Sequence, residues 1–211
     1  MDVGGTLGIA ERPGITAALV AASPLGARDA VRLLRQRLHT APAITDQLVN
    51  EICRALRIPP TEFPRDTAAA PLRLFAEVPQ ALERISAVRP VVTLSNVTCI
   101  EAESDRLKSM LSPWVTDHFP SCRIGYAKPD RRAFQVVASQ WGLHTRQMVH
   151  IGDHWECDIL GAVHAGARAI WISRGRALPE ANRLVRSNVL VAADLGAAAE
   201  HVRDLCMRRP R

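Results

Sequence analysis

Two short acidic loops at opposite ends of the sequence contain its most reactive side chains. The first is Asp2-Val3-Gly4-Gly5-Thr6, and the second runs from Gly152-Asp153 to Asp158. Carboxylate oxygens from two such loops can hold a divalent cation, and an aspartate can also attack phosphorus or carbon as a nucleophile. The first loop has no second carboxylate, because Gly4 stands two residues after Asp2. The functional prediction depends mainly on these two facts.

Two further polar clusters follow the same pattern. Ser95-Asn96 comes directly after the apolar run 91–94, and Lys128 precedes Pro129-Asp130. Taken alone, each cluster could be an ordinary helix cap or helix start. Lys128 is the most informative, because Lys occurs only at positions 108 and 128 while Arg is used freely. The ammonium of lysine is a compact point charge, so a lysine at this position, instead of the common arginine, favours an electrostatic role.

The elements that must position these loops are predicted from apolar periodicity and from turn residues. Strands alternating with helices favour an α/β fold, a doubly wound parallel sheet with helices on both faces. In such sheets, ligands bind at the carboxyl ends of the strands, where all four polar clusters fall. The expected strands are 91–94, 148–151, 167–172 and 189–191, and the expected helices are 78–88, 102–111, 129–141, 159–165 and 195–205.

The helical pattern from residue 15 to about 58 interrupts this alternation. Two apolar stripes lie there among polar residues, and prolines at 24, 42, 59 and 60 separate the segments. We therefore expect residues 14–70 to form an inserted helical cap, and residues 1–13 and 71–211 to form the α/β core.

Composition limits the class of protein. The chain has 211 residues, 47% of them hydrophobic, which suits one domain with an inserted lid. Its net charge of +6 would attract a small anionic substrate, whereas nucleic acid is not expected because no Arg-rich block is interleaved with aromatic residues. Five isolated cysteines, no membrane-spanning apolar run and no signal peptide predict a cytoplasmic protein. The sequence does not indicate an oligomeric state.

Taken together and in this order, the four clusters resemble the haloacid dehalogenase-like (HAD) hydrolase superfamily, in its helical-cap subclass. The resemblance rests on 2–6, Leu94-Ser95-Asn96, Lys128-Pro129-Asp130 and 152–158, and the stretch 161–166 matches the usual continuation. It covers nearly the whole core. It implies a Rossmann-like core and a magnesium-dependent hydrolase that acts on a small phosphorylated substrate through an aspartyl-phosphate intermediate.

The resemblance also implies a role for each matching residue. Asp2 would be the nucleophile, Lys128 would neutralise charge on Asp2 and the phosphoryl group, and Asp158 would orient the metal shell or Lys128. The expected catalytic residues are Asp2, Ser95, Lys128 and Asp158. The expected substrate contacts are Thr6, Ser95, Asn96 and Lys128, and the expected Mg²⁺ ligands are Asp2, the Gly4 carbonyl and Asp153.

Two departures from the family pattern affect this expectation. Family phosphatases usually have an aspartate as general acid where this chain has Gly4, and such a group is worth roughly 10²–10⁴-fold in rate. Only Met1 precedes Asp2, so the first core strand is expected to be truncated. Losing four or five buried aliphatic side chains would forfeit on the order of 6–15 kcal/mol. The chain as written is therefore expected to fold loosely, unless its true start lies upstream.

Two other functions stay open at this stage. A haloacid dehalogenase-type hydrolase also begins with an aspartate nucleophile, tolerates a non-acidic residue at position 4 and needs no metal. A catalytically inactive binding protein that kept the fold would also explain Gly4 and the missing strand. A phosphonatase is disfavoured, because that branch uses a cap lysine and residues 7–75 contain none. Metal-dependent turnover of an aryl phosphate would separate these functions.

Overall fold

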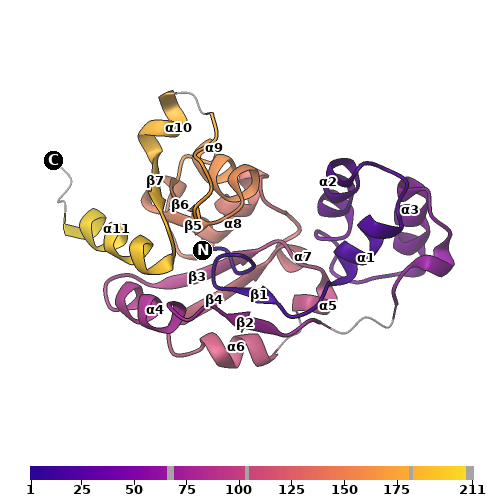
Figure 1. Cartoon of the computed structure of the whole chain (residues 1–211), viewed down its shortest axis with the longest axis horizontal. Coiled ribbons are helices and arrows are strands. Elements are labelled where there is room, and N and C mark those ends of the chain that lie inside the picture. The colour runs from indigo at the N-terminus through magenta and orange to yellow at the C-terminus, as the bar shows by residue number, and fades with distance from the viewer. Residues whose placement is uncertain (66–68, 103–104, 181–182, 208–211) are drawn as a thin grey trace.

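The computed structural model describes residues 1–65, 69–102, 105–180 and 183–207. Figure 1 shows an α/β core and, beside it, a group of three helices. These helices are α1 (Ile15–Ala22), α2 (Ala27–Arg37) and α3 (Asp46–Leu56). The architecture confirms the predicted α/β fold with parallel strands and many helices.

The core strands form two parallel groups. Strand β3 (Val91–Ser95) pairs with β4 (Val115–Pro120), and β5 (Val149–Gly152) pairs with β6 (Arg168–Ile172), which pairs with β7 (Val189–Ala192). All of these pairs are parallel, so their carboxyl ends lie along shared edges of the sheet. The functional loops follow those ends.

Met1 and Asp2 lie between the two groups of strands. The Asp2 amide donates to the Ile151 carbonyl on β5 at 2.8 Å. On the other side, Leu94 of β3 donates to the Met1 carbonyl at 2.8 Å, and the Met1 amino group donates to the Val92 carbonyl at 2.6 Å. These bonds link β3 to β5 through the backbone of Met1 and Asp2.

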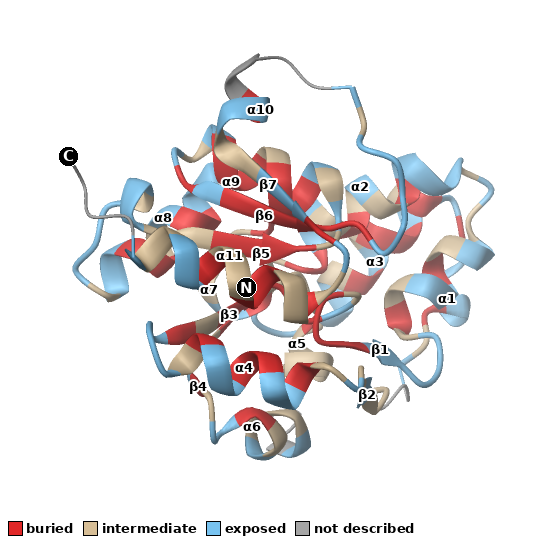
Figure 2. Cartoon of the chain, turned by 60° about the vertical axis from the view of Figure 1, so that its left-hand side comes forward, coloured by how far each residue is buried: buried red, intermediate tan, exposed pale blue. Residues whose placement is uncertain are grey.

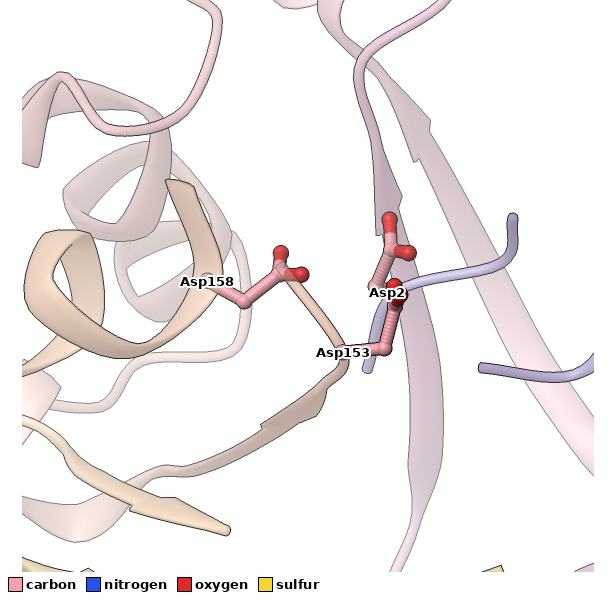
Figure 3. Close-up of side chains that lie close together, drawn as sticks. All are labelled: Asp2, Asp153 and Asp158. Carbon is pink, nitrogen blue, oxygen red and sulfur yellow. The ribbon is translucent and has the colours of Figure 1, made fainter. Parts of the chain in front are cut away.

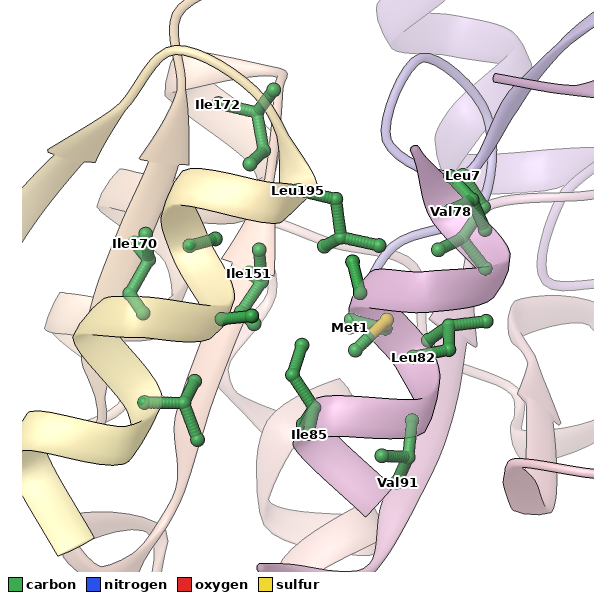
Figure 4. Close-up of a cluster of buried hydrophobic side chains, with 14 of the residues drawn as sticks. Met1, Leu7, Val78, Leu82, Ile85, Val91, Ile151, Ile170, Ile172 and Leu195 are labelled. Atoms are coloured by element: carbon green, nitrogen blue, oxygen red, sulfur yellow. The ribbon is translucent and has the colours of Figure 1, made fainter. Parts of the chain in front are cut away.

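Helices cover both faces of the sheet (Figures 1 and 2). Helices α4 (Val78–Ser86) and α11 (Leu195–Met207) pack on one face, in the cluster that contains Met1 and Ile151 (Figure 4). Helices α8 (Arg131–Gln140) and α9 (Gly161–His164) pack on the other face, around Phe134 and Trp171. Because both faces are buried, β5 and β6 are apolar over most of their length.

The three N-terminal helices have a hydrophobic cluster of their own, which includes Leu34, Ile52 and Phe63. Thr45 caps α3, since its side chain accepts a hydrogen bond from the Leu48 amide. The short strands β1 (Gly8–Ala10) and β2 (Leu72–Leu74) are antiparallel and hold the two connections to the core together. The predicted cap boundary of 14–70 stays a prediction, and its residues 66–68 lie outside the described residues.

Most of the predicted core elements are present within one to three residues of their expected ends. The predicted helix 102–111 is instead divided between α5 (Cys99–Ala102) and α6 (Asp105–Leu111), and residues 103–104 are not described. The predicted helix 159–165 begins earlier, as a π-helix over Trp155–Leu160 that continues into α9. The smaller elements are η1 (Pro60–Glu62), α7 (Ser121–Ile124), η2 (Thr145–Gln147) and α10 (Arg183–Asn188). Within the described residues, no helix is both long and apolar enough to cross a bilayer.

Candidate active site

The loops after the strands meet at one edge of the sheet and open into a cavity of about 620 Å³. Asp2 bonds to β5 through its amide, Ser95 ends β3, and Asp153 follows β5. Figure 3 shows Asp158 pointing from the π-helix toward Asp2 and Asp153. The structure therefore brings together residues that lie up to 156 positions apart in the sequence.

Lys128 occupies the centre of this cluster and is 2% exposed. Its ammonium contacts Asp2 Oδ1 at 2.6 Å, the Leu94 carbonyl at 2.6 Å and Asp158 Oδ1 at 2.7 Å. Burial alone would lower the pKa of Lys128, but the adjacent carboxylates of Asp158 and Asp2 outweigh it and raise the pKa above its ordinary value. Lys128 is therefore charged at every physiological pH.

The backbone of Lys128 is fixed by Asn96. The Asn96 side chain accepts from the Lys128 amide at 2.8 Å and donates to the Lys128 carbonyl at 2.7 Å. Asp130 caps α8 two residues later by accepting from the Arg132 amide. Asn96 lines the cavity, but these two bonds use its amide group to position Lys128.

Asp158 is buried, and both of its oxygens have partners within the protein. Oδ1 contacts Lys128 and lies 3.2 Å from His150 Nε2, and Oδ2 accepts from the His154 amide at 2.9 Å. Burial would raise the pKa of Asp158, but the charge of Lys128 and these hydrogen bonds lower it below its ordinary value. A Cβ on Gly152 would lie 2.4 Å from Asp158 Cβ, so a glycine is needed for this close approach.

Asp2 has one oxygen bound to Lys128 and one oxygen with only a long contact. The Thr6 hydroxyl lies 3.5 Å from Asp2 Oδ2. Burial is the main reason why the pKa of Asp2 is raised to about 6, with a further contribution from the Asp158 charge, and Lys128 opposes both. Asp2 is thus ionised at neutral pH and keeps Oδ2 available for a ligand.

The acidic groups fit a divalent cation. Asp2, Asp153 and Asp158 each offer an oxygen, and these oxygens lie within 4.8 Å of one another. Three carboxylates face one buried ammonium, and the nearest other cation, Arg176, lies 3.4 Å from Asp153 Oδ2 and is half-exposed. Burial, followed by the Asp158 charge, raises the pKa of Asp153, and the Arg176 and His154 charges oppose both. Hard oxygen ligands with excess negative charge are what Mg²⁺ prefers.

The two glycines of the first loop differ sharply in the space around them. A Cβ on Gly5 would lie 2.5 Å from Asp153 Oδ1, and Gly5 has a φ of +77°, so a side chain there is excluded. A Cβ on Gly4 would meet no atom within 4 Å. The missing acid at position 4 is therefore not imposed by crowding.

The N-terminal helices, which form the predicted cap, contribute side chains to the same cavity. Arg35, whose side chain is 13% exposed, lines it together with Thr16 and His39. His39 Nε2 lies 2.8 Å from the Thr16 hydroxyl. The sequence singles out neither Arg35 nor His39, because no pattern in it shows which face of α2 meets the core. His150 was also overlooked, although a polar residue within an apolar strand was a usable signal.

Among the predicted site residues, those lining the cavity are Asp2, Gly4, Ser95, Asn96, Lys128, Asp153 and Asp158. Thr6 is fully buried behind Asp2 and does not line it. The expected substrate contact of Thr6 stays a prediction, and its observed contact is with the predicted nucleophile.

Part of the chain is similar in sequence to known proteins. Residues 125–198 match the family model described as HAD-hydrolase-like. A phosphoserine phosphatase from Thermus thermophilus is 36% identical over 55 residues, which cover 26% of this chain and 22% of the relative. The match thus spans less than a quarter of the length of that relative.

Solved structures share the fold over almost the whole chain. A 2-haloacid dehalogenase from Pseudomonas syringae has a TM-score of 0.62 at 17% identity, covering 97% of this chain and 96% of that chain. A HAD phosphatase from Thermococcus onnurineus has a TM-score of 0.57 at 16% identity, with coverages of 98% and 95%. A HAD-type protein from Bacillus subtilis bound to magnesium has a TM-score of 0.58 at 16% identity, covering 96% of both chains.

At these identities the structural matches show the fold, while the family-model match includes residues that build the site. The family match includes Lys128, Asp153 and Asp158, and the fold places Asp2 against them. Residues 125–198 are thus similar to HAD-type hydrolases, and the chain as a whole shares the fold of solved HAD-type structures.

Proposed function

We propose that this protein is a magnesium-dependent hydrolase of a small, anionic phosphate monoester, acting through an aspartyl-phosphate intermediate. The observation on which this depends is the convergence of Asp2, Asp153 and Asp158 around the buried Lys128. Excess carboxylate charge suits a divalent cation, and a cation suits a phosphoryl group. The similar structure from Bacillus subtilis, which is bound to magnesium, supports the proposed metal. The phosphatase from Thermococcus onnurineus supports the proposed phosphate substrate.

Each residue of the cluster has a distinct task. A carboxylate oxygen of Asp2 forms a bond to phosphorus while the bond between phosphorus and the leaving oxygen breaks. Lys128 holds the Asp2 carboxylate in place and offsets charge at the reaction centre. Mg²⁺ held by Asp2, Asp153 and the Gly4 carbonyl would supply positive charge to the phosphoryl oxygens. Asp158, with both oxygens engaged, positions Lys128.

Gly4 restricts the substrates that react rapidly. No side chain at position 4 can protonate the leaving oxygen, so an alkyl alcohol would leave as an unstable alkoxide. Substrates whose leaving group is already acidic, such as aryl phosphates, should therefore react fastest. Ser95 lines the cavity at the end of β3 and is placed to donate to a phosphate oxygen. Five free cysteines are consistent with action in the cytoplasm.

The test combines magnesium calorimetry with turnover of an aryl phosphate. We expect Asp153→Asn to weaken magnesium binding at least ~10-fold and to abolish turnover, because the two carboxylate ligands are then reduced to one. The matched control is Asp117→Asn, since Asp117 lies exposed on β4. Equal magnesium affinity in wild type and Asp153→Asn, both folded, would reject the metal site.

One observation favours a second candidate, a haloacid dehalogenase. A departing halide needs no proton, so the open space at Gly4 would cost such an enzyme nothing. The fold neighbour from Pseudomonas syringae is a protein of that kind. Release of chloride from a 2-chloro carboxylic acid in the presence of a chelator, without turnover of any phosphate ester, would replace the phosphatase proposal.

A further inference from the structure

The loop that follows β6 has an uncommon backbone conformation beside the candidate site. Arg174 and Gly175 in this loop have φ angles of +45° and +80°. Glycine adopts such angles readily, whereas a residue with a side chain keeps them only where its surroundings fix the backbone. The loop is anchored to the end of β7, because the Ser173 amide donates to the Ala192 carbonyl at 2.8 Å and the Arg174 amide donates to the Ala193 carbonyl at 3.1 Å.

The Arg174 side chain reaches from this loop to the first acidic loop. Its Nε donates to the Gly5 carbonyl at 3.1 Å, and its Nη2 donates to the Thr6 carbonyl at 3.3 Å. The guanidinium carbon lies 3.6 Å from the centre of the Phe75 ring, and both terminal nitrogens lie 3.4 Å from Glu77 Oε1. One planar guanidinium, held by an aromatic face and a carboxylate, thus binds two successive carbonyls of the first loop.

These two carbonyls belong to the turn that presents the proposed metal ligands. Gly5 has a φ of +77°, and the peptide between Gly4 and Gly5 carries the carbonyl that we expect to bind Mg²⁺. The Thr6 hydroxyl lies 3.5 Å from Asp2 Oδ2. Because glycine is the most flexible residue, a turn with two successive glycines needs hydrogen bonds from outside to keep one conformation. Arg174 supplies two such bonds.

The same loop also contacts the backbone of the second acidic loop. Arg176 Nη2 donates to the Asp153 carbonyl at 2.8 Å and to the Ile172 carbonyl at 2.9 Å. Trp171 Nε1 donates to the same Asp153 carbonyl at 3.0 Å. The end of β6 and the loop after it are therefore tied to both loops that carry the proposed magnesium ligands.

We propose that Arg174 is a positioning residue for the metal site. It holds the Gly5 and Thr6 carbonyls and thereby keeps Asp2 and the Gly4 carbonyl directed at a divalent cation. Its own carboxylate partner is Glu77, which lies outside the acidic cluster, and its hydrogen bonds to the first loop go to backbone oxygens. This role rests on the proposed function, because it requires the magnesium site.

Charge and position predict opposite effects of removing Arg174. A positive side chain repels a divalent cation, so the loss of its charge alone would strengthen magnesium binding. A residue that orients metal ligands from outside the coordination shell does the reverse, because its removal weakens binding. The sign of the change in magnesium affinity therefore separates a positioning role from a purely electrostatic one.

The test measures magnesium affinity by calorimetry in the full chain. We expect Arg174→Gln to bind magnesium ~10-fold more weakly than wild type, although it removes a positive charge. Arg174→Lys keeps the charge, but one ammonium cannot replace the planar guanidinium, so magnesium affinity should fall by at least ~3-fold. The matched control is Arg168→Gln, an exposed change at the start of β6, which should bind magnesium as wild type does.

A measurement on metal-free protein separates this inference from the proposed function. The Gly5 and Leu7 amides donate to carbonyls next to the turn at 2.7 Å and 2.8 Å. Hydrogen exchange at both amides should be ~10-fold faster in Arg174→Gln than in wild type, while exchange at Phe134 on α8 should stay the same.

Unchanged exchange at Gly5 and Leu7 in folded Arg174→Gln would overturn the inference, whether or not the protein binds magnesium. Magnesium affinity in Arg174→Gln that equals or exceeds that of wild type would also overturn it. If Arg174→Gln does not fold, Arg174→Lys decides by the same two measurements. An absence of magnesium binding in both wild type and Arg168→Gln would instead reject the proposed function, and the metal role of Arg174 with it.

Discussion

At the scale of single residues, the site depends on one ammonium with no spare donor. Lys128 directs its three N–H groups at Asp2, Asp158 and the Leu94 carbonyl, all within 2.7 Å. A guanidinium is larger and planar, so it cannot reproduce three converging bonds from one point. The free-energy cost of leaving Asp158 buried without its cation is of the order of several kcal/mol.

We therefore predict that Lys128→Arg loses at least ~100-fold in kcat for an aryl phosphate and that Lys128→Met loses more. Melting temperatures measured alongside will separate misfolding from lost chemistry. Arg131→Lys, an exposed change at the first position of α8, serves as the control. Full turnover by folded Lys128→Arg would show that the ammonium does not act at the reaction centre.

A second residue-scale prediction concerns Gly4. Because a Cβ there meets no atom within 4 Å, Gly4→Asp should be accommodated and should restore a general acid. We expect kcat for an alkyl phosphate to rise by at least ~10-fold, and by less for an aryl phosphate, whose leaving oxygen needs no proton. The measurement is kcat for both esters in wild type, Gly4→Asp and Gly4→Ala.

A substitution at the neighbouring glycine, Gly5, serves as a control that the structure should not accommodate. Gly5→Ala should abolish magnesium binding, since its Cβ would lie 2.5 Å from Asp153 Oδ1. A Gly4→Asp protein that is folded and binds magnesium, yet hydrolyses neither ester faster, would contradict the view that only the acid is missing.

At the scale of elements, the sequence predicted β3 and β5, which precede loops of the candidate site, because these strands are short apolar runs followed by polar residues. It missed β4, whose sequence Val-Thr-Asp-His-Phe-Pro mixes apolar and polar residues at the edge of the sheet. It also missed the β1–β2 pair, since strands of three residues lack a readable period. The inward orientation of Arg35 depends on how α2 packs, which local sequence does not encode.

Helix α2 also leads to a prediction about pH. His39 follows its end, is buried, and lies beside Thr16 and Arg35. Burial, followed by the charge of Arg35, lowers the pKa of His39 from 6.5 to about 4. The folded state thus favours neutral His39, so its stabilising effect is complete above pH 6.5 and is lost as the pH falls toward 4.

We expect the free energy of unfolding to fall between pH 7 and pH 4.5 by about 2 kcal/mol more in wild type than in His39→Gln. Denaturant titrations at the two pH values measure this difference. His164→Gln, at an exposed position, should behave as wild type. The same pH dependence in all three proteins would mean that His39 is already protonated or solvated in the fold.

At the scale of the whole molecule, two bodies with separate hydrophobic cores share one cavity. The cap helices pack around their own cluster, and the α/β core packs around two others. The cavity takes its carboxylates and Lys128 from the core, and Arg35 and His39 from the cap. Metal binding and chemistry should therefore depend on the core, and substrate choice on the cap.

This division predicts the effect of removing the cap. Because β1 and β2 pair with Gly8 opposite Leu74 and Ala10 opposite Leu72, the two chain connections already lie side by side. A short Gly/Ser linker can therefore replace residues 14–70. We expect the shortened protein to keep its magnesium affinity within about two-fold, since every proposed ligand lies outside the cap. The KM for a small anionic phosphate ester should rise at least ~10-fold, because Arg35 and His39 would no longer line the cavity.

A point variant tests the same division without deleting residues. Arg35→Gln in the full chain should also raise KM and should leave magnesium affinity unchanged. Arg28→Gln, an exposed change on the same helix, is its control. If the shortened protein lost magnesium binding while remaining folded by circular dichroism, the cap would be part of the metal site and the division would be wrong. If KM were unchanged in both variants, the core alone would select the substrate.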